Sequence, residues 1–491
     1  MPMHYKALSS VWTLKRKANG IFRARLTMRD YEQIPGLHFS PAWTSAPVTS
    51  AVTVRIVIVL LLMMGGYAHI VDVCSAFLLG MFSNGERLYA TVPEGWEHRF
   101  PPNALLLLMR TIYGLKQAAN CFYRLLVSVM TMLLFKKSLA DPCLYHKWDA
   151  DHGLILWISY CDDLLCIGRT QDSVLGEVAA VKKHFNVDDV GALADYLGCN
   201  LSFDWDARSC RFTQPVLVRS LLDEYAASDR PTGLPAVPGS VLCRPSEGDE
   251  ELSDGLVKDY KAKVGRLLHM VAWSRPDISN AVRDVSRFGH RCTKKHRKAV
   301  QQVIDYVWQT PERGWFLKPA RLWSGLDRTF QFKITGKSDS SYATCIDTRK
   351  SVTGYVVYLE GAPVAIKSVM QRIIALSVTE AELIALVQCT QEIFFVKKVL
   401  ESLGLTVELP MKLQCDNKGA VDLINGHSVG GNTKHIDVRI LHVRDYKDKG
   451  VIAVEWIPTY KNESDMCTKN NTKSLFNKHS KHFIGEDKYH H

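Results

Sequence analysis

The chain lacks the features that mark secreted, membrane-spanning and disulfide-stabilised proteins. Its 13 cysteines are odd in number and scattered singly, which indicates reduced thiols and no disulfide framework. The most apolar stretch, Ala51 to Met64, is interrupted by Arg55 and is shorter than the about 20 residues that cross a bilayer. The N-terminus has no basic segment leading into an apolar run and a cleavage site. We therefore expect a buried helix at that stretch, no membrane partner, and an intracellular location in the nucleus or a cytoplasmic particle.

Neither sign of charge dominates, although basic residues are in modest excess. The balance of 61 Lys+Arg against 50 Asp+Glu leaves a formal net charge of +11, which favours a polyanionic partner such as nucleic acid. Solubility alone is the other explanation. With 491 residues, 47% of them hydrophobic, the chain is long enough for two or three cores.

No internal repeats or long low-complexity tracts divide the chain, so its boundaries come from changes in pattern. The N-terminal part alternates short apolar runs with helical patterns, which is typical of a mixed α/β fold. A stretch rich in proline, glycine and acidic residues, Asp229 to Asp254, predicts a linker. Helical spacing follows it, and then strand-like runs around a long helix, Thr379 to Leu403. We expect four segments, namely an α/β domain, a linker with connecting helices, a smaller α/β domain and a polar tail: 1–228, 229–330, 331–474 and 475–491.

A pair of aspartates, Asp162 and Asp163, interrupts two apolar strand-like runs within Leu154 to Gly168. Asp tolerates tight turns, so the pair is equally typical of a simple hairpin tip. Asp72 lies ninety residues earlier in another apolar run, where an unpaired carboxylate is costly to bury. A divalent cation shared between these aspartates compensates the charge, because hard cations prefer carboxylate oxygens. Two such ions support nucleotidyl transfer.

At these residues the chain resembles a known family. The Tyr160-Cys161-Asp162-Asp163 segment is similar to the reverse transcriptase catalytic box, and its surroundings resemble copia-type retrotransposon polymerases. Other segments match landmarks of that family in order: Ile112 to Ala118, Asp141 to Tyr145, Asp195 to Gly198 and Ser274 to Ile278.

The resemblance implies a first catalytic site with two Mg²⁺ ions, or Mn²⁺. It makes Asp72 and Asp162 the main ligands, with help from Asp163 and the Val73 carbonyl. It also implies that Phe77 is an aromatic gate against the ribose 2′-hydroxyl, although a core phenylalanine is the alternative. The other nucleotide contacts that it implies are Tyr113, Gly114, Lys116 and Arg25. Four basic residues near the N-terminus are candidates for phosphate binding, and a solvated charged strand is the alternative interpretation: Lys15, Lys17, Arg23 and Arg25.

The C-terminal part resembles the ribonuclease H of the same family. The similar segments are Ser338 to Tyr342, Arg349 to Tyr355, Ala375 to Glu382, Cys415 to Asn417, Thr433 to Arg439 and Asn462 to Asp465. The resemblance implies a second site that holds two metal ions beside a scissile phosphate, with four carboxylate ligands: Asp339, Glu382, Asp416 and Asp465.

Two other carboxylates compete with this set. Glu380 lies about 200° around a helix from Glu382, so the two cannot share one site, and the resemblance favours Glu382. Asp347 competes weakly with Asp339, but its polar neighbours favour a solvated turn.

The resemblance thus predicts a right-hand polymerase with fingers, palm and thumb, a connecting helical region and a ribonuclease H-like domain. Such an enzyme copies an RNA template from a DNA primer using deoxynucleoside triphosphates, and cleaves the RNA of the resulting hybrid. The alternative is a catalytically degenerate remnant that only binds nucleic acid. Protease and integrase signatures are missing, so we expect the last part of a longer polyprotein or a truncated copy.

Overall fold

A computed structural model describes most of the chain, in five ranges: 6–16, 20–82, 85–224, 232–426 and 434–485. For 222–224 and 434–438 it describes the backbone alone. Lys17 and most side chains of the 433–439 motif therefore lie outside the described residues. The chain forms two compact units. Unit 1 comprises Met1–Ser50 and Tyr67–Ala192, and unit 2 comprises Ala51–Gly66 and Leu193–His491.

Unit 1 is built on a six-stranded sheet whose neighbouring strands are all antiparallel. In spatial order the strands are β10 (Val187–Ala192), β3 (Tyr67–Val73), β9 (Asp163–Gly168), β8 (Gly153–Tyr160), β7 (Leu144–Asp149) and β6 (Lys136–Lys137). Helices α2 (Ala118–Met132) and α3 (Gln171–Lys182) contribute apolar side chains to one core with these strands. Strands β8 and β9 are almost entirely buried, which explains their nearly continuous apolar sequence.

Two smaller antiparallel ribbons complete unit 1. They are β1 (Ser10–Arg16) with β2 (Phe22–Met28), and β4 (Leu88–Thr91) with β5 (Leu105–Leu108). In the first ribbon Lys15 pairs with Arg23 and Thr13 with Arg25. Paired residues of an antiparallel ladder point to the same side, so Lys15, Arg23 and Arg25 make one basic face.

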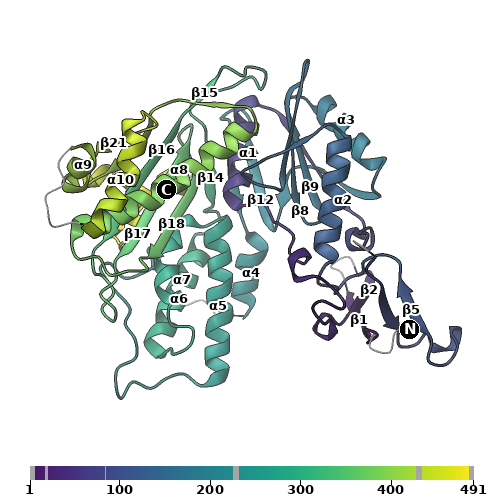
Figure 1. Cartoon of the computed structure of the whole chain (residues 1–491). Coiled ribbons are helices and arrows are strands. Elements are labelled where there is room, and N and C mark those ends of the chain that lie inside the picture. Colours follow the sequence, from purple (N-terminus) through teal and green to yellow (C-terminus); the bar gives the residue numbers. More distant parts are fainter. Residues whose placement is uncertain (1–5, 17–19, 83–84, 225–231, 427–433, 486–491) are drawn as a thin grey trace. The chain divides into compact units, whose positions relative to one another are not determined.

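Unit 2 contains a five-stranded mixed sheet (Figure 1). Its strands are, in order, β18 (Ala362–Met370), β17 (Val352–Leu359), β16 (Ile334–Ser341), β20 (Met411–Cys415) and β21 (Ile452–Trp456). The first three are mutually antiparallel, and β16, β20 and β21 are parallel. Helix α8 (Val378–Ser402) packs on β16 and β17, and is followed in the chain by α9 (Lys418–Asn425) and α10 (Lys434–Asp448). The predicted strand, long helix and return to strands are therefore present.

The region before this sheet is helical, as predicted from its apolar spacing. Helices α5 (Asp254–Trp273), α6 (Ser279–Ser286) and α7 (Lys294–Gln309) pack together (Figure 1). The remaining elements of unit 2 are helix α4, the four-stranded sheet β11-β12-β13-β14 and the short parallel pair β15-β19. Their bounds are Pro215–Glu224, Asp195–Tyr196, Cys199–Asp204, Ser209–Thr213, Trp315–Leu317, Gln331–Phe332 and Thr406–Val407.

Helix α11 (Lys473–Ile484) occupies much of the segment that was expected to be a polar tail. Phe476 and Phe483 are buried in the same core as the connecting helices. Their spacing of seven residues places them on one helical face, so the polar composition of the segment concealed an amphipathic helix.

Helix α1 (Ala51–Met64) is the predicted buried helix, and every residue from Thr53 onward is buried. It belongs to unit 2 although the strands that flank it in sequence belong to unit 1. Within the described ranges, no helix combines the length and apolar character that a membrane crossing requires.

Candidate active sites

Three predicted aspartates meet at one end of the unit 1 sheet, and we call Asp72, Asp162 and Asp163 cluster 1. Asp72 on β3 pairs directly with Asp163 on β9, so both side chains lie on the same face. The Val73 N–H donates to the Asp162 carbonyl at 2.9 Å, which ties β3 to the turn between β8 and β9.

That turn is tight. Tyr160 pairs with Asp163, leaving Cys161 and Asp162 as a two-residue loop. Cys161 has a φ of 55°, a left-handed conformation that is uncommon for a residue other than glycine, asparagine or aspartate. Such strain is typical of functional sites, and here it lifts Asp162 out of the ladder and beside its two partners.

Burial and neighbouring carboxylates raise the pKa values of Asp72 and Asp163. Burial, followed by the charges of Asp162 and Asp72, raises the pKa of Asp163 to about 6. Burial, Asp162 and Asp188 raise the pKa of Asp72, against the opposing charges of Arg23 and Arg25. The two arginines on the basic face of the β1–β2 ribbon therefore act electrostatically on Asp72.

Asp188 is an acidic neighbour that the sequence analysis missed. It lies on β10 directly opposite Asp72, so three aspartates follow one another across β10, β3 and β9. Nothing in the local sequence distinguishes Asp188 from the adjacent Asp189, which instead pairs with His69 and Lys182. Only the strand register separates the two.

Three of the predicted nucleotide-binding residues form a continuous contact. Phe77 lies on the 3-10 turn Ala76–Leu78, and its ring meets that of Tyr113 edge-on with centroids 5.3 Å apart. The Arg25 guanidinium lies 4.4 Å above the Tyr113 ring, in a cation–π geometry. The Thr111 hydroxyl donates to the Phe77 carbonyl at 2.7 Å, which fixes the turn that carries the ring.

The other two support this arrangement from the loop before α2. Gly114 has a φ of 87°, and a Cβ at this position would lie 2.1 Å from the Met28 carbonyl oxygen; only glycine fits there. The Lys116 ammonium lies 5.1 Å from the centre of the Phe39 ring, and its backbone N–H donates to Gln33 at 2.8 Å.

The four predicted C-terminal carboxylates also meet, in unit 2, and we call Asp339, Glu382, Asp416 and Asp465 cluster 2. Asp339 lies on β16, and Asp416 follows the neighbouring parallel strand, in which Cys415 pairs with Ser338. Glu382 is on α8 and accepts a hydrogen bond from the Ser340 N–H at 3.2 Å. Asp339, Glu382 and Asp465 are 2%, 4% and 3% exposed, so this site is much more enclosed than a surface acidic patch.

The segment 462–469 connects the members of cluster 2. Asn462 donates to the Asp416 carboxylate at 3.2 Å and to the Ser338 carbonyl at 2.9 Å. The Thr468 hydroxyl donates to the Asp339 carboxylate. The Lys469 ammonium lies 2.5 Å from Asp465 Oδ1 and 3.6 Å from Asp339 Oδ2.

The sequence analysis selected only Asp465 from this segment. Thr468 and Lys469 follow it at the third and fourth positions, a spacing that places side chains on one side of a helical turn. That spacing was the signal that could have identified them.

Burial and mutual repulsion also raise pKa values in cluster 2. Burial raises the pKa of Asp339, and the charges of Asp465 and Asp416 add to this against the opposing charge of Lys469. Burial and the charges of Asp339 and Asp416 raise the pKa of Glu382. Carboxylates that repel one another in a buried site are a favourable setting for a divalent cation.

The donor set of cluster 2 fits a hard metal ion. Among the described residues, Glu382, Cys415 and Asp416 have ligand atoms within 4.8 Å of one another. Burial raises the pKa of the Cys415 thiol well above its usual value, so its neutral form leaves the carboxylate oxygens as the charged donors. The thiol is another neighbour that the sequence analysis did not select.

The two competing carboxylates have other partners. Glu380 accepts the Leu376 N–H at 2.7 Å and lies 3.2 Å from Arg439 Nη1. Asp347 accepts the Arg244 N–H at 3.0 Å and lies 3.4 Å from Arg287 Nη2. Both are therefore held away from cluster 2 by specific contacts.

Unit 1 is thus an antiparallel sheet with three carboxylates at one end, and comparison with known proteins identifies the family of this part of the chain. Residues 1–234 match the reverse transcriptase (RNA-dependent DNA polymerase) family. Residues 1–234 thus form a reverse transcriptase family domain, and the curated relatives that span most of the chain are copia-type retrotransposon Pol polyproteins.

Two of these relatives come from plants. The retrovirus-related Pol polyprotein from transposon TNT 1-94 of Nicotiana tabacum is 29% identical over 478 residues, covering 96% of this chain and 35% of the relative. The corresponding polyprotein from transposon RE1 of Arabidopsis thaliana is 27% identical over 483 residues, covering 97% and 31%. The chain thus spans about a third of the length of these relatives.

Among solved structures, a foamy viral protease–reverse transcriptase in complex with double-stranded DNA is similar over 92% of this chain and 65% of that chain. Its TM-score is 0.48 and its sequence identity 12%. The family assignment rests on the sequence matches.

Proposed function

We propose that this chain is an RNA-directed DNA polymerase with ribonuclease H activity, each at its own carboxylate cluster. The observation that carries the proposal is the presence of two separate clusters on two different sheets, cluster 1 in unit 1 and cluster 2 in unit 2. A catalytically silent nucleic-acid-binding protein has no need of buried carboxylates whose repulsion must be compensated.

In unit 1, Asp72, Asp162 and Asp163 would hold two Mg²⁺ or Mn²⁺ ions. When bound, such ions supply Lewis-acid stabilisation of the attacking and leaving oxygens. The protein's own contribution is positioning. The positive charges of Arg23 and Arg25 act on Asp72. Their guanidinium groups are suited to bind the triphosphate of a deoxynucleotide. The Phe77 ring, braced by Tyr113, would exclude a ribose 2′-hydroxyl by contact.

In unit 2, the four carboxylates of cluster 2 would hold two ions beside the scissile phosphate of an RNA–DNA hybrid. Asn462 and Thr468 orient Asp416 and Asp339 through the hydrogen bonds given above. Orientation of this kind reduces the reorganisation needed when the substrate binds. The proposed partners are thus an RNA template, a DNA primer, their hybrid and deoxynucleoside triphosphates, in the nucleus or a cytoplasmic particle.

The test is primer extension on an RNA template by the purified chain, with cleavage of a labelled RNA–DNA hybrid measured in parallel. We expect both activities with Mg²⁺ or Mn²⁺, and loss of both with EDTA. Folded protein that binds the hybrid in a salt-sensitive manner but shows neither activity would identify a degenerate remnant instead.

A further inference from the structure

Cluster 2 contains a cation supplied by the protein itself. The Lys469 ammonium contacts Asp465 at 2.5 Å and Asp339 at 3.6 Å. In the described part of the chain these are the ion pairs of cluster 2. Glu382 and Asp416 have ligand atoms close to each other and to the Cys415 thiol. The four carboxylates therefore divide into a half that holds the ammonium and a half that does not.

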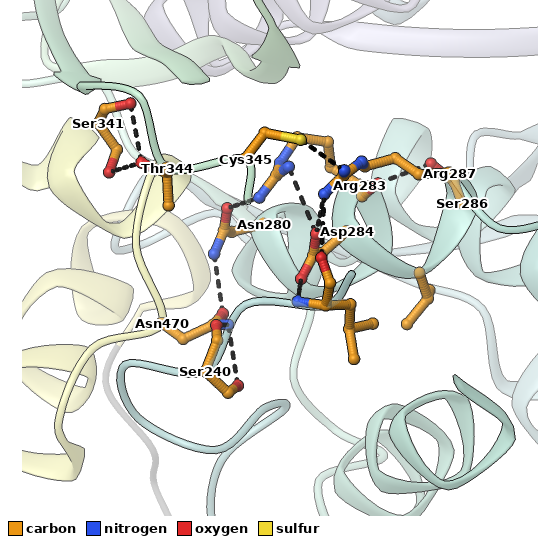
Figure 2. Close-up of polar contacts among 12 residues, drawn as sticks. Ser240, Asn280, Arg283, Asp284, Ser286, Arg287, Ser341, Thr344, Cys345 and Asn470 are labelled. Atoms are coloured by element: carbon orange, nitrogen blue, oxygen red, sulfur yellow. Dashed lines mark hydrogen bonds and ion pairs between the residues drawn. The ribbon is translucent and has the colours of Figure 1, made fainter. Parts of the chain in front are cut away.

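The backbone around Lys469 is firmly held. Its N–H donates to the Asp465 carbonyl at 3.1 Å. The next residue, Asn470, accepts a hydrogen bond from the Asn280 amide at 2.8 Å and donates to the Ser240 carbonyl at 2.8 Å (Figure 2). Its own carbonyl accepts the Gly239 N–H at 2.8 Å. The backbone that carries Lys469 is thus held in place by hydrogen bonds within unit 2.

The side chain of Lys469 can nevertheless leave. It is 44% exposed, whereas those of Asp339 and Asp465 are 3% and 4% exposed. A lysine has a flexible four-carbon stem and a strongly hydrated head, so its ammonium can move into water while the backbone stays fixed. The two carboxylates cannot follow it.

An ammonium and a divalent cation compete for the same oxygens. Both are attracted by Asp339 and Asp465, and they repel each other at such short range. Without metal, the ammonium offsets part of the repulsion among the buried carboxylates. A metal ion at this half must displace it, whereas the Glu382–Asp416 half has no such competitor among the described residues.

We propose that Lys469 is an internal competitor of the divalent cation, which stabilises metal-free cluster 2 and weakens binding of the ion at the Asp339–Asp465 half. This proposal rests on the proposed function of cluster 2 as a metal site. It makes the two halves unequal, so that the Glu382–Asp416 half fills at a lower metal concentration. Lys469 is then a positioning residue that sets the metal requirement of the site.

The experiment titrates Mn²⁺ into protein without nucleic acid, followed by calorimetry. Asp72→Asn and Asp162→Asn are present in every protein, so that cluster 1 contributes little heat. We expect one stronger and one weaker binding event. Lys469→Gln should strengthen the weaker event about tenfold, and should lower the melting temperature in EDTA but not in saturating Mn²⁺. Lys469→Met, which keeps much of the aliphatic stem, serves the same purpose if Lys469→Gln does not fold.

The matched control is Lys412→Gln. Lys412 is 45% exposed and lies 3.0 Å from Glu455, so it resembles Lys469 in exposure and pairing but belongs to neither half. We expect it to leave both binding events unchanged. Weaker or unchanged Mn²⁺ binding by Lys469→Gln would overturn the competition. Absence of Mn²⁺ binding in the parent protein, together with absence of hybrid cleavage by the unmutated chain, would instead overturn the proposed function of cluster 2.

Discussion

Truncation of Arg55 to alanine should destabilise unit 2 by about 1–3 kcal/mol. Arg55 is 4% exposed and donates from Nε to the Val364 carbonyl at 2.7 Å and from Nη1 to the Ala272 carbonyl at 2.9 Å. Neither carbonyl has its usual partner. A bulge in β18 leaves Val364 outside the ladder register, and Ala272 belongs to the last turn of α5, whose carbonyls have no partner within the helix.

The magnitude follows from opposing effects. Each buried carbonyl left without a donor costs about 1–3 kcal/mol. The contact between the guanidinium and the Trp315 ring, at 3.7 Å, is worth about 2 kcal/mol when desolvated. An opposing effect is that burial lowers the pKa of Arg55 to about 9. At about 1.4 kcal/mol per pKa unit, keeping the buried guanidinium charged costs the native state a few kcal/mol, and the truncation removes that cost. The net effect remains a loss.

Hydrogen–deuterium exchange in increasing urea measures this effect, because it reports the free energy of opening of each unit separately. Arg55→Met should recover part of the loss, since it fills the volume without restoring the donors. Arg372→Ala, at an exposed arginine, is the control and should change stability by less than about 0.5 kcal/mol. An Arg55→Ala protein whose unit 2 is as stable as the parent's would refute the assignment of the two hydrogen bonds.

Three further predictions concern the clusters. Asp162→Asn should abolish primer extension and spare hybrid cleavage, and Asp339→Asn should do the reverse; equal loss of both activities in one folded variant would contradict separate sites. Phe77→Val should raise incorporation of ribonucleotides relative to deoxynucleotides about a hundredfold, equivalent to about 2.7 kcal/mol, as single-nucleotide kinetics would show, whereas unchanged discrimination would return Phe77 to a core role. Burial and the neighbouring carboxylates raise the pKa of Asp163 from 3.8 to about 6. The folded state therefore holds this proton more tightly than the unfolded state. The resulting contribution to the stability of metal-free unit 1 is fully present below pH 3.8 and is lost as the pH rises through 6. Melting curves of the parent and Asp163→Asn in EDTA at pH 5 and pH 7.5 should therefore differ in pH dependence, and parallel curves would show that Asp163 ionises normally.

Much of the local structure was predictable from the sequence. The apolar run Ala51 to Met64 predicted a buried helix, and α1 is one. The two apolar runs on either side of Asp162 and Asp163 predicted two strands and a turn, and these are β8, β9 and the turn between them. The prediction of a polar tail was wrong for the residues that form α11. It rested on composition and did not consider the helical spacing of the aromatic residues. The division into 1–228, 229–330 and 331–474 stays a prediction, as do the roles of the individual carboxylates.

The sequence by itself determined the local elements and the residue types of both clusters, because apolar periodicity and motif spacing act over a few neighbouring residues. Only the tertiary structure decided which distant residues meet. The register of β10 against β3 places Asp188, not Asp189, opposite Asp72. Helix α1 belongs to unit 2 because Arg55 has partners more than 200 positions away in the chain. Lys469 likewise reaches Asp339 only in the folded chain. The chemistry of a side chain determines which partners it can bind, but strand register and packing determine which of them lie within reach.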